Sequence, residues 1–579
     1  MRTLFTKYKP IKMKRLATFS ILSLVSLLCS LSVSAQGDIW LDINGVRDLT
    51  ADSIEVANQA RPVPGSSRRG DNPVLFLVGN STMRTGTLGN GNNGQWGWGF
   101  YAHEYYDENK ITVENHALGG TSPRTFYNQL WKPVLDAVRK GDYVFLELGH
   151  NDNGPIDSIR ARSSYRPNGR LEVAEDSINI YNKVSKQNET VYTFGGYIRR
   201  FINEVRAKGA TPVLFTLTPR NAYEENDPKK IQRKLTDFTP AIFAIGKETG
   251  TPVIDLNDIS AKKLEKYGAW KTDYHFFLDK IHSSAYGARM NAQSAAEGIQ
   301  ASTDPQLAFL RTCLSDRVTP RRCDQKRKKG LPMVFLCGDS TGKNEDKNPD
   351  GMWGWGSQGY TVFDSTKCVF QNQAKAGRST RTFIDEERWE EVYNSLEPGD
   401  FVLIQFGHND IGGIDRDKER GVIATSQDSC KVFKLASNGQ YRVIYSYGWY
   451  LKKMIRDAQE KGAIPILLSL TPRNEWHEGN GTPRGTIYPV KEKKGKMYIE
   501  RRNESYGKWC RDVAEETGAE FVDVHNITAN ALDKIGQKKA AAYFNHDHTH
   551  TSLLGAKLNA QSVAKGLKEI GSPAAKLLK

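Results

Sequence analysis

Cysteine is scarce and unevenly placed in this chain of 579 residues, which holds seven cysteines. Cys29 lies near the N-terminus, and the other six all lie in the second half. A fold that depended on disulfides would need cysteines throughout its length, so this distribution excludes a small disulfide scaffold. Cys313 and Cys323 are close enough in sequence to close a small loop, but sequence alone does not assign pairs.

Long hydrophobic runs are absent beyond residue 31, so nothing after that point is predicted to cross a bilayer. The one apolar run, 17–31, follows a basic segment and precedes the small residues at 33–35. This pattern predicts a signal peptide over 1–35 and a periplasmic or secreted protein, with no stable membrane insertion after cleavage. The alternatives are a membrane anchor, for which the run is short, and a lipoprotein anchor at Cys29, which the bulky Leu28 disfavours.

Acidic residues are fewer than basic ones, 66 against 81, and the formal charge is +15. The predicted signal peptide contains six basic residues and no acidic ones, so its removal leaves a charge near +9. A basic surface attracts anionic partners. For an exported protein we expect an acidic polysaccharide and no nucleic acid, with general solubility as the simpler explanation.

The chain is an internal duplication, because six sequence blocks recur in the same order in its two halves. A chain of this length also exceeds what one hydrophobic core can hold. The paired blocks are PVLFLVGNST (73–82) and PMVFLCGDST (332–341), QWGWG (95–99) and MWGWG (352–356), NHALGGTSPRTF (115–126) and NQAKAGRSTRTF (372–383), GDYVFLELGHND (141–152) and GDFVLIQFGHND (399–410), KGATPVLFTLTPRN (208–221) and KGAIPILLSLTPRN (461–474), and YGARMNAQSAAEGI (286–299) and LGAKLNAQSVAKGL (554–567).

Each copy alternates short apolar runs with longer amphipathic segments, which predicts a parallel sheet covered by helices on both faces. In the first copy the strands are expected at 74–78, 143–148, 212–217 and 252–256, and helices at 195–207 and 283–300. The fold class is therefore α/β, as two tandem three-layer α/β/α domains. We place the first domain at 71–303, a basic connector at 304–330 and the second domain at 331–579, with an N-terminal extension of unassigned role at 36–70.

A serine follows the first expected strand of each copy, at Ser81 and Ser340. A hydroxyl at the end of a strand, entering a helix, is well placed as a nucleophile, because the helix N-terminus can stabilise an oxyanion. Taken alone, such a serine is more simply a helix cap.

An Asp-x-x-His pair precedes the last helix of each copy: Asp279 with His282, and Asp547 with His550. The spacing lets the carboxylate hold one imidazole nitrogen while the other faces a hydroxyl, as in a catalytic triad. A lone histidine near a helix start is usually structural, but here it recurs beside the other blocks.

The sequence Gly-His-Asn-Asp follows an apolar strand in both copies and places Asn151 and Asn409 at a strand end. An asparagine amide there can donate a hydrogen bond to a developing oxyanion. Gly120 and Gly377 lie in turn-like segments and can offer a backbone N–H to the same site.

Together these blocks resemble those of the SGNH (GDSL-type) hydrolase family, over nearly all of both copies. The resemblance implies a flavodoxin-like fold and acyl transfer without a cofactor or metal. It implies serine nucleophiles (Ser81, Ser340), histidine bases (His282, His550) oriented by aspartates (Asp279, Asp547), and oxyanion holes formed by Gly120 and Asn151 or by Gly377 and Asn409, with the serine N–H.

Within that family the second copy is similar to the rhamnogalacturonan acetylesterases, through GDST (338–341), N-x-A-x-x-G-R-S (372–379) and DHTHTS (547–552). The resemblance implies removal of acetyl groups from acidic pectic polysaccharide. The first copy departs from the pattern: Asn80 replaces Asp339, Thr121 replaces Arg378, and DKIHSS replaces DHTHTS. We expect activity to survive these changes, with an altered substrate preference.

Several alternatives stay open. One copy could be a carbohydrate-binding relic, or the enzyme could be a lipase or thioesterase. Gly338–Gly342 also fits G-x-S-x-G, but an α/β-hydrolase has strands before its serine. The alternating histidines 546, 548 and 550 could bind a metal, although the first copy offers only His282 and a shifted His275. The tryptophans of W-G-W-G could stack on sugars or pack in the core.

Overall fold

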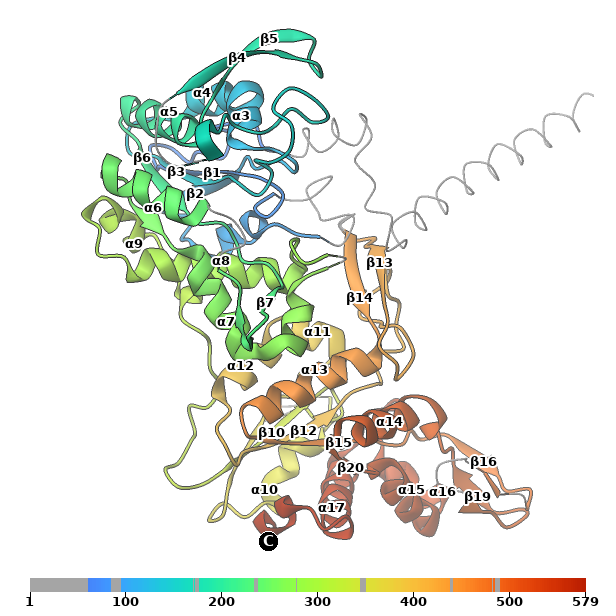
Figure 1. Cartoon of the computed structure of the whole chain (residues 1–579). Helices are drawn as coiled ribbons and strands as arrows, with labels where there is room; N and C mark the ends of the chain where they lie inside the picture. Colours follow the sequence, from blue (N-terminus) through green and yellow to red (C-terminus); the bar gives the residue numbers. More distant parts are fainter. Residues whose placement is uncertain are drawn as a thin grey trace, which may run out of the picture.

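The computed structural model describes residues 61–84, 95–169, 171, 176–233, 238–277, 279–343, 350–437, 441–481, 483–484 and 490–579. The predicted signal peptide and most of the N-terminal extension therefore lie outside the described residues. Two five-stranded parallel sheets organise the chain (Figure 1). Their strand orders are β2-β1-β3-β6-β9 and β11-β10-β12-β15-β20, which are the same order in the two copies.

The strands of the first sheet are β1 (Val74–Gly79), β2 (Thr112–Asn115), β3 (Tyr143–Glu147), β6 (Thr211–Phe215) and β9 (Val253–Ile254). Those of the second sheet are β10 (Met333–Gly338), β11 (Val369–Asn372), β12 (Phe401–Gln405), β15 (Ile464–Leu468) and β20 (Glu520–Val522). All neighbours pair in parallel, so the carboxyl ends of the strands meet at one edge of each sheet.

Each sheet has a hydrophobic core on both faces, because successive side chains of a strand point to opposite sides. In β1, Leu75 and Leu77 pack with α8 (Ala285–Ala301), whereas Phe76 and its alternate neighbours pack with α5 (Phe194–Ala207). In the second sheet β10 packs in the same alternating way, with α17 (Leu553–Glu569) on one face and α13 (Tyr447–Glu460) on the other. This confirms the two predicted three-layer α/β/α units.

The expected elements of the first copy match the structure closely at β1, β3, β6, α5 and α8. The strand expected at 252–256 is shorter, with only Val253 and Ile254 in β9. Asp255 ends it because its carboxylate accepts the N–H of Asp258 at 3.2 Å and caps α7 (Leu256–Thr272). An apolar run thus contains the end of a strand and the start of a helix, which periodicity alone does not separate.

Part of the expected connector packs as a continuation of the first unit. Residues 308–312 form helix α9, and Leu310 and Val318 lie in the core on the α8 face. Only the stretch after them runs to the second unit, where Arg327 pairs with Asp400 at 2.6 Å. Residues 319–330 are strongly basic, whereas 304–318 contain the apolar residues that pack in the first core.

The described end of the N-terminal extension also packs on the first unit. Arg68 pairs with the buried Asp142 at 2.7 Å, and the N–H of Ser67 donates to Glu114 at 2.7 Å. All six cysteines of the described residues are free thiols. Cys313 lies in the core of the first unit and Cys323 packs against the core of the second, which is why they do not pair.

The two units contact each other through α7 and α8 of the first and α12 (Arg388–Ser395) and α13 of the second (Figure 1). Lys271 Nζ lies 2.9 Å from Asp457 Oδ1, and both side chains are buried. The Tyr274 ring packs on Trp449 with centroids 4.3 Å apart. These buried contacts fix the orientation of one unit on the other. Among the described residues no helix is both long and apolar enough for a membrane span.

Candidate active site

Each predicted nucleophile lies in a tight turn after the first strand of its copy, β1 or β10, which pairs with a neighbour on each side in its sheet. Asn80 Oδ1 accepts the N–H and the hydroxyl of Thr82 at 3.1 and 2.9 Å. In the second copy Asp339 Oδ1 accepts the same two groups of Thr341 at 2.9 and 2.8 Å. The side chain before each serine therefore closes the turn and fixes the serine at the carboxyl edge of the sheet.

The expectation that the serine enters a helix is wrong for the described residues: 81–84 form a turn. The carbonyls of this turn bind the W-G-W-G segment, with the N–H of Gly97 donating to Arg84 O at 2.9 Å and that of Trp98 to Thr82 O at 2.9 Å. A Cβ on Gly97 would lie 2.2 Å from Arg84 O. Glycine is required at position 97 because the backbone of the W-G-W-G segment meets the backbone of the serine turn. No pattern in the sequence of the serine block indicates this contact.

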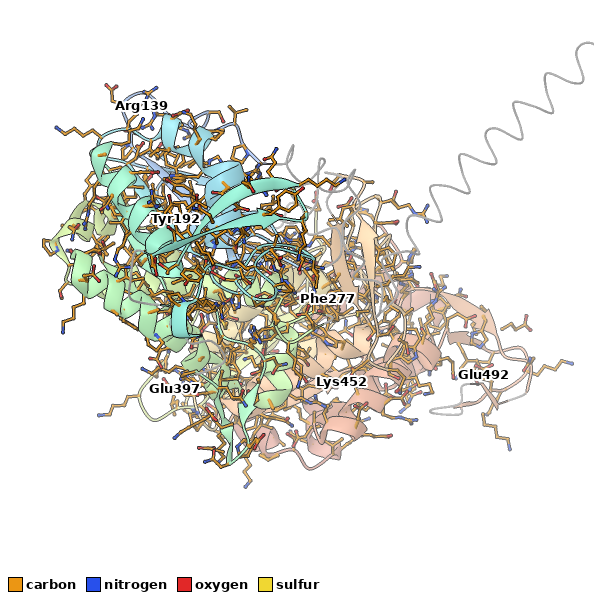
Figure 2. The ribbon with its side chains drawn as sticks, turned by 45° about the horizontal axis from the view of Figure 1, so that its top comes forward. Arg139, Tyr192, Phe277, Glu397, Lys452 and Glu492 are labelled. Carbon is orange, nitrogen blue, oxygen red and sulfur yellow. The ribbon has the colours of Figure 1, made fainter. Side chains whose placement is uncertain are left out.

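The structure brings serine, histidine and aspartate together in both copies. In the first, His282 Nε2 lies 2.9 Å from Ser81 Oγ and His282 Nδ1 lies 2.6 Å from Asp279 Oδ2. In the second, His550 lies 2.9 Å from Ser340 and 2.6 Å from Asp547 through the same atoms. The turn that carries the first pair follows Phe277, which is labelled in Figure 2.

The aspartates are held by more than the imidazole. Asp279 Oδ1 accepts the N–H groups of Ile281 and His282 at 2.8 and 2.7 Å. Partial burial works to raise its pKa, but the hydrogen bonds and charge of His282 outweigh that and lower it. The same opposing causes lower the pKa of Asp547 to about 2. Both carboxylates are therefore ionised at neutral pH and can stabilise an imidazolium.

The predicted oxyanion asparagines bond the segments that carry the predicted oxyanion glycines. Asn151 Nδ2 donates to Thr121 O at 3.1 Å, and Asn409 Nδ2 donates to Arg378 O at 2.9 Å. An amide carries two N–H donors, so one fixes the side chain and the second stays available for substrate. Gly120 and Gly377 have φ of 81° and 78°, a left-handed conformation that glycine adopts without strain.

The family model described as GDSL-like lipase/acylhydrolase matches residues 77–290 and again residues 336–558, which together are more than half of the chain. The chain belongs to this family. Both matches contain a complete Ser-His-Asp set, and the predicted resemblance is therefore confirmed. The protein is a carboxylic ester hydrolase.

The curated relatives of this GDSL-like hydrolase each align with about two fifths of the chain. A rhamnogalacturonan acetylesterase of Emericella nidulans is 27% identical over 234 residues, which cover 40% of this chain and 84% of the relative. A probable rhamnogalacturonan acetylesterase of Bacillus subtilis, YesY, is 27% identical over 249 residues, 42% of this chain and 94% of the relative. The solved structure of Bacillus subtilis YxiM is 20% identical with a TM-score of 0.32, and the alignment covers 42% of this chain and 57% of that chain.

The two copies of the hydrolase exchange an acid and an amide beneath the nucleophile. In the first, Asn80 adjoins the serine and the buried carboxylate is Glu147, which accepts Trp98 Nε1 at 2.8 Å and the Thr82 hydroxyl at 3.1 Å. In the second, Asp339 adjoins the serine, and Gln405 accepts Trp355 Nε1 at 2.7 Å. Each copy thus buries one carboxylate below its serine turn, but at different positions.

Replacing Glu147 by Gln, the residue of the second copy, is expected to stabilise the first unit above neutral pH. Burial raises the pKa of Glu147 to about 7, from 4.5 in the unfolded chain. The stability that this shift contributes is present below pH 4.5 and lost as pH rises through about 7. We expect Glu147→Gln to raise the free energy of unfolding by about 1–3 kcal/mol at pH 8.

Denaturant unfolding between pH 4.5 and 8 measures this effect of Glu147→Gln, and Glu225→Gln, at an exposed site, is the control. A gain of equal size at every pH would contradict an ionisation effect.

The histidine of Gly-His-Asn-Asp has a structural place that the sequence did not indicate. His150 Nε2 lies 3.2 Å from Thr218 Oγ1, and His408 Nε2 lies 3.4 Å from Thr471 Oγ1. Burial, followed by the positive charges of Arg220 and His282, lowers the pKa of His150 to about 3, and the His408 pKa is lowered similarly. Both imidazoles are neutral at working pH and link two strand ends.

Gln95 is a site residue that sequence reasoning missed. Its Nε2 donates to Asp279 Oδ2 at 3.1 Å and to Phe277 O at 2.9 Å, so it supports the carboxylate of the first triad. The second copy has Met352 at this position. Only the difference between QWGWG and MWGWG in the repeat could have signalled it.

Of the two roles considered for the tryptophans of W-G-W-G, the structure shows core packing for two of them. Trp98 and Trp355 are buried and bonded to Glu147 and Gln405, so these two tryptophans pack in the core. Among the described residues no group of three or more His, Cys, Asp or Glu side chains is arranged to hold a metal ion. Of the alternating histidines, His550 faces Ser340 instead.

Proposed function

We propose that this chain is an exported serine carbohydrate esterase that removes acetyl groups from acetylated rhamnogalacturonan or a related pectic polysaccharide. The observation that carries the proposal is the duplicated Ser-His-Asp geometry, with a Ser–His distance of 2.9 Å in both copies. The substrate class is supported by the two relatives described above, a rhamnogalacturonan acetylesterase and a probable rhamnogalacturonan acetylesterase.

The proposed mechanism is acyl transfer through an acyl-enzyme. His282 takes the Ser81 proton as the oxygen attacks the acetyl carbonyl, and Asp279 stabilises the imidazolium that forms. The oxyanion lies between the serine N–H, the N–H of Gly120 and the free amide hydrogen of Asn151. His282 returns the proton to the leaving sugar hydroxyl and then activates the water that releases acetate. Ser340, His550, Asp547, Gly377 and Asn409 take the same roles in the second copy.

Both sites are proposed to be active but not equivalent. The second retains Asp339 and Arg378, and the Arg378 side chain pairs with Glu386 at 2.9 Å beside the oxyanion segment. In the first, the Thr121 hydroxyl turns inward and donates to Leu118 O at 2.7 Å. The rim of the first site therefore lacks a cation that the second has, which supports a different substrate preference.

Export to the periplasm or outside the cell is part of the proposal and rests on the predicted signal peptide at 1–35. The mature charge near +9 supports an acidic polysaccharide as substrate, because opposite charges accelerate encounter. A pectic substrate is expected in that compartment, and no nucleic-acid or stable membrane partner is proposed.

The test is acetate release from acetylated rhamnogalacturonan by the purified protein, compared with neutral acetylated polysaccharide and with a long-chain acyl ester. We expect release from the acidic polysaccharide to be fastest, and we expect it to persist in a metal chelator, since no step uses a cofactor. Preferential hydrolysis of the long-chain ester would instead support a lipase or thioesterase. No hydrolysis of any acetyl ester would contradict the proposal.

A further inference from the structure

Each active site contains an arginine that the proposed mechanism does not use. It stands at the same position in both copies. The sequence Thr-Pro-Arg-Asn follows β6 at 218–221 and β15 at 471–474, so Arg220 and Arg473 lie at the carboxyl edge of their sheets. The threonine of each motif bonds the buried histidine of Gly-His-Asn-Asp, at 3.2 Å for Thr218. The beginning of the loop is thereby fixed to the strand that carries the oxyanion asparagine.

The asparagine of the same motif fixes the other end of the loop to the catalytic turn. The N–H of Asn221 donates to Lys280 O at 2.8 Å, and the N–H of Asn474 donates to His548 O at 2.7 Å. Lys280 and His548 each lie between the aspartate and the histidine of a triad. The arginine is therefore held between the oxyanion strand and the Asp-x-x-His turn, with one neighbour bonded to each.

The charge of the arginine reaches the centre of the site. After burial, the largest cause that lowers the pKa of His150 is Arg220, followed by His282. After burial, the largest cause that lowers the pKa of His408 is Arg473, followed by His550. The same buried imidazole thus lies within electrostatic range of the arginine and of the catalytic histidine in both copies.

Neither arginine has a carboxylate partner in the part of the chain that the structure describes. Both are half-buried, and Arg220 Nε is buried without a hydrogen bond. Two other arginines of the first unit are paired, Arg124 with Glu189 at 2.5 Å and Arg199 with Glu248 at 2.5 Å. A partly desolvated guanidinium without a counterion raises the free energy of the folded protein. Its occurrence at the active site of both copies therefore points to a ligand that supplies the anion.

We propose that Arg220 and Arg473 bind a carboxylate of the substrate, so that each site recognises an acetylated saccharide through a neighbouring uronic acid group. This inference rests on the proposed function and deepens it. A planar guanidinium matches a carboxylate with two parallel N–H donors, which gives orientation as well as affinity. The arginine then positions the acetyl carbonyl at the serine by holding the acid group of the same chain.

The experiment isolates each site and changes only the charge of the substrate. In the Ser340→Ala protein, Arg220→Gln and Arg220→Lys are compared on an acetylated oligogalacturonide and on the same oligosaccharide with its carboxyls methyl-esterified, with acetate release as readout. We expect Arg220→Gln to lower kcat/KM on the acidic substrate by about 10- to 100-fold, mainly through KM. The preference for the acidic over the methylated substrate disappears, and the lysine variant restores part of it.

Matched controls separate this effect from a general loss of positive charge. Lys208→Gln removes one charge at an exposed position where α5 ends, at the opposite edge of the sheet, and is expected to keep the preference. Arg473→Gln in the Ser81→Ala protein, with the exposed Lys538→Gln as its control, repeats the test in the second copy. Equal losses on the acidic and methylated substrates would overturn the inference, since the arginine would then act on the machinery and not on the carboxylate.

A binding measurement keeps the inference distinguishable from the proposed function. Calorimetry with the Ser81→Ala, Ser340→Ala protein and an oligogalacturonide needs no turnover. Weaker binding after Arg220→Gln and Arg473→Gln supports carboxylate recognition even where no acetate is released from any substrate. Unchanged binding overturns it even where the esterase activity is established.

Discussion

Acetate release is expected to disappear when Ser81 and Ser340 are both replaced by alanine, with a fall in kcat of roughly five to six orders of magnitude. Each single variant is expected to keep the activity of the other site. The reason is that both hydroxyls face an imidazole at 2.9 Å, so both can be deprotonated for attack. Acetate release from acetylated pectin by the three variants measures this, and Ser185→Ala, at an exposed position, is the control.

The single variants also decide between two enzymes and one enzyme with a binding module. If Ser340→Ala alone removed all activity, the first copy would be a binding or specificity unit despite its complete triad. If the double variant retained the wild-type rate, the serine mechanism itself would be excluded. The ratio of the two single-variant rates on acidic and neutral acetyl esters then reports how far the sites have diverged.

Loss of the oxyanion amide is expected to give the second largest effect. Asn151→Ala in the Ser340→Ala protein, and Asn409→Ala in the Ser81→Ala protein, should lower kcat by about 10²–10³-fold with little change in KM. The amide hydrogen that does not bond the carbonyl of Thr121 or Arg378 meets the oxygen only when it becomes an oxyanion, so its loss raises the transition state and not the bound substrate.

A neighbouring amide provides the control for this prediction. Asn153 lies in the same loop, and its Nδ2 donates to His150 O at 3.3 Å. Asn153→Ala should therefore keep most of the kcat that Asn151→Ala loses. A rise in KM with unchanged kcat after Asn151→Ala would argue against an oxyanion role and for ground-state binding.

Much of this site was predictable because its chemistry lies in short sequence blocks that repeat. The aspartate and histidine of each triad are three residues apart, so their contact is local, and the serine follows a buried strand that its apolar run reveals. Because parallel strands end at one edge of a sheet, the blocks that follow β1 and β3 were expected to converge. The serine, histidine and aspartate of each copy do lie within hydrogen-bond distance, and the mutants above test their roles.

Other features depend on contacts between distant segments, and no local pattern encodes those. The serine turn is not a helix because W-G-W-G, more than ten residues later, takes its carbonyls. The acid beneath the first serine is Glu147, which reads in sequence as an unremarkable strand residue. Helix α9 belongs to the first core although a basic linker follows it, and Cys313 and Cys323 lie in different cores.

The sequence by itself determined the duplication, the parallel α/β architecture of each copy and the family, because these depend on periodicity and on short spacings within one chain segment. Only the tertiary structure decided which carboxylate is buried under each serine, which glutamine supports the first aspartate, and where Arg220 and Arg473 lie. Those placements arise where loops from different strands meet at the sheet edge. The position of a side chain there depends on packing between segments that are up to 210 residues apart, as Ser340 and His550 are.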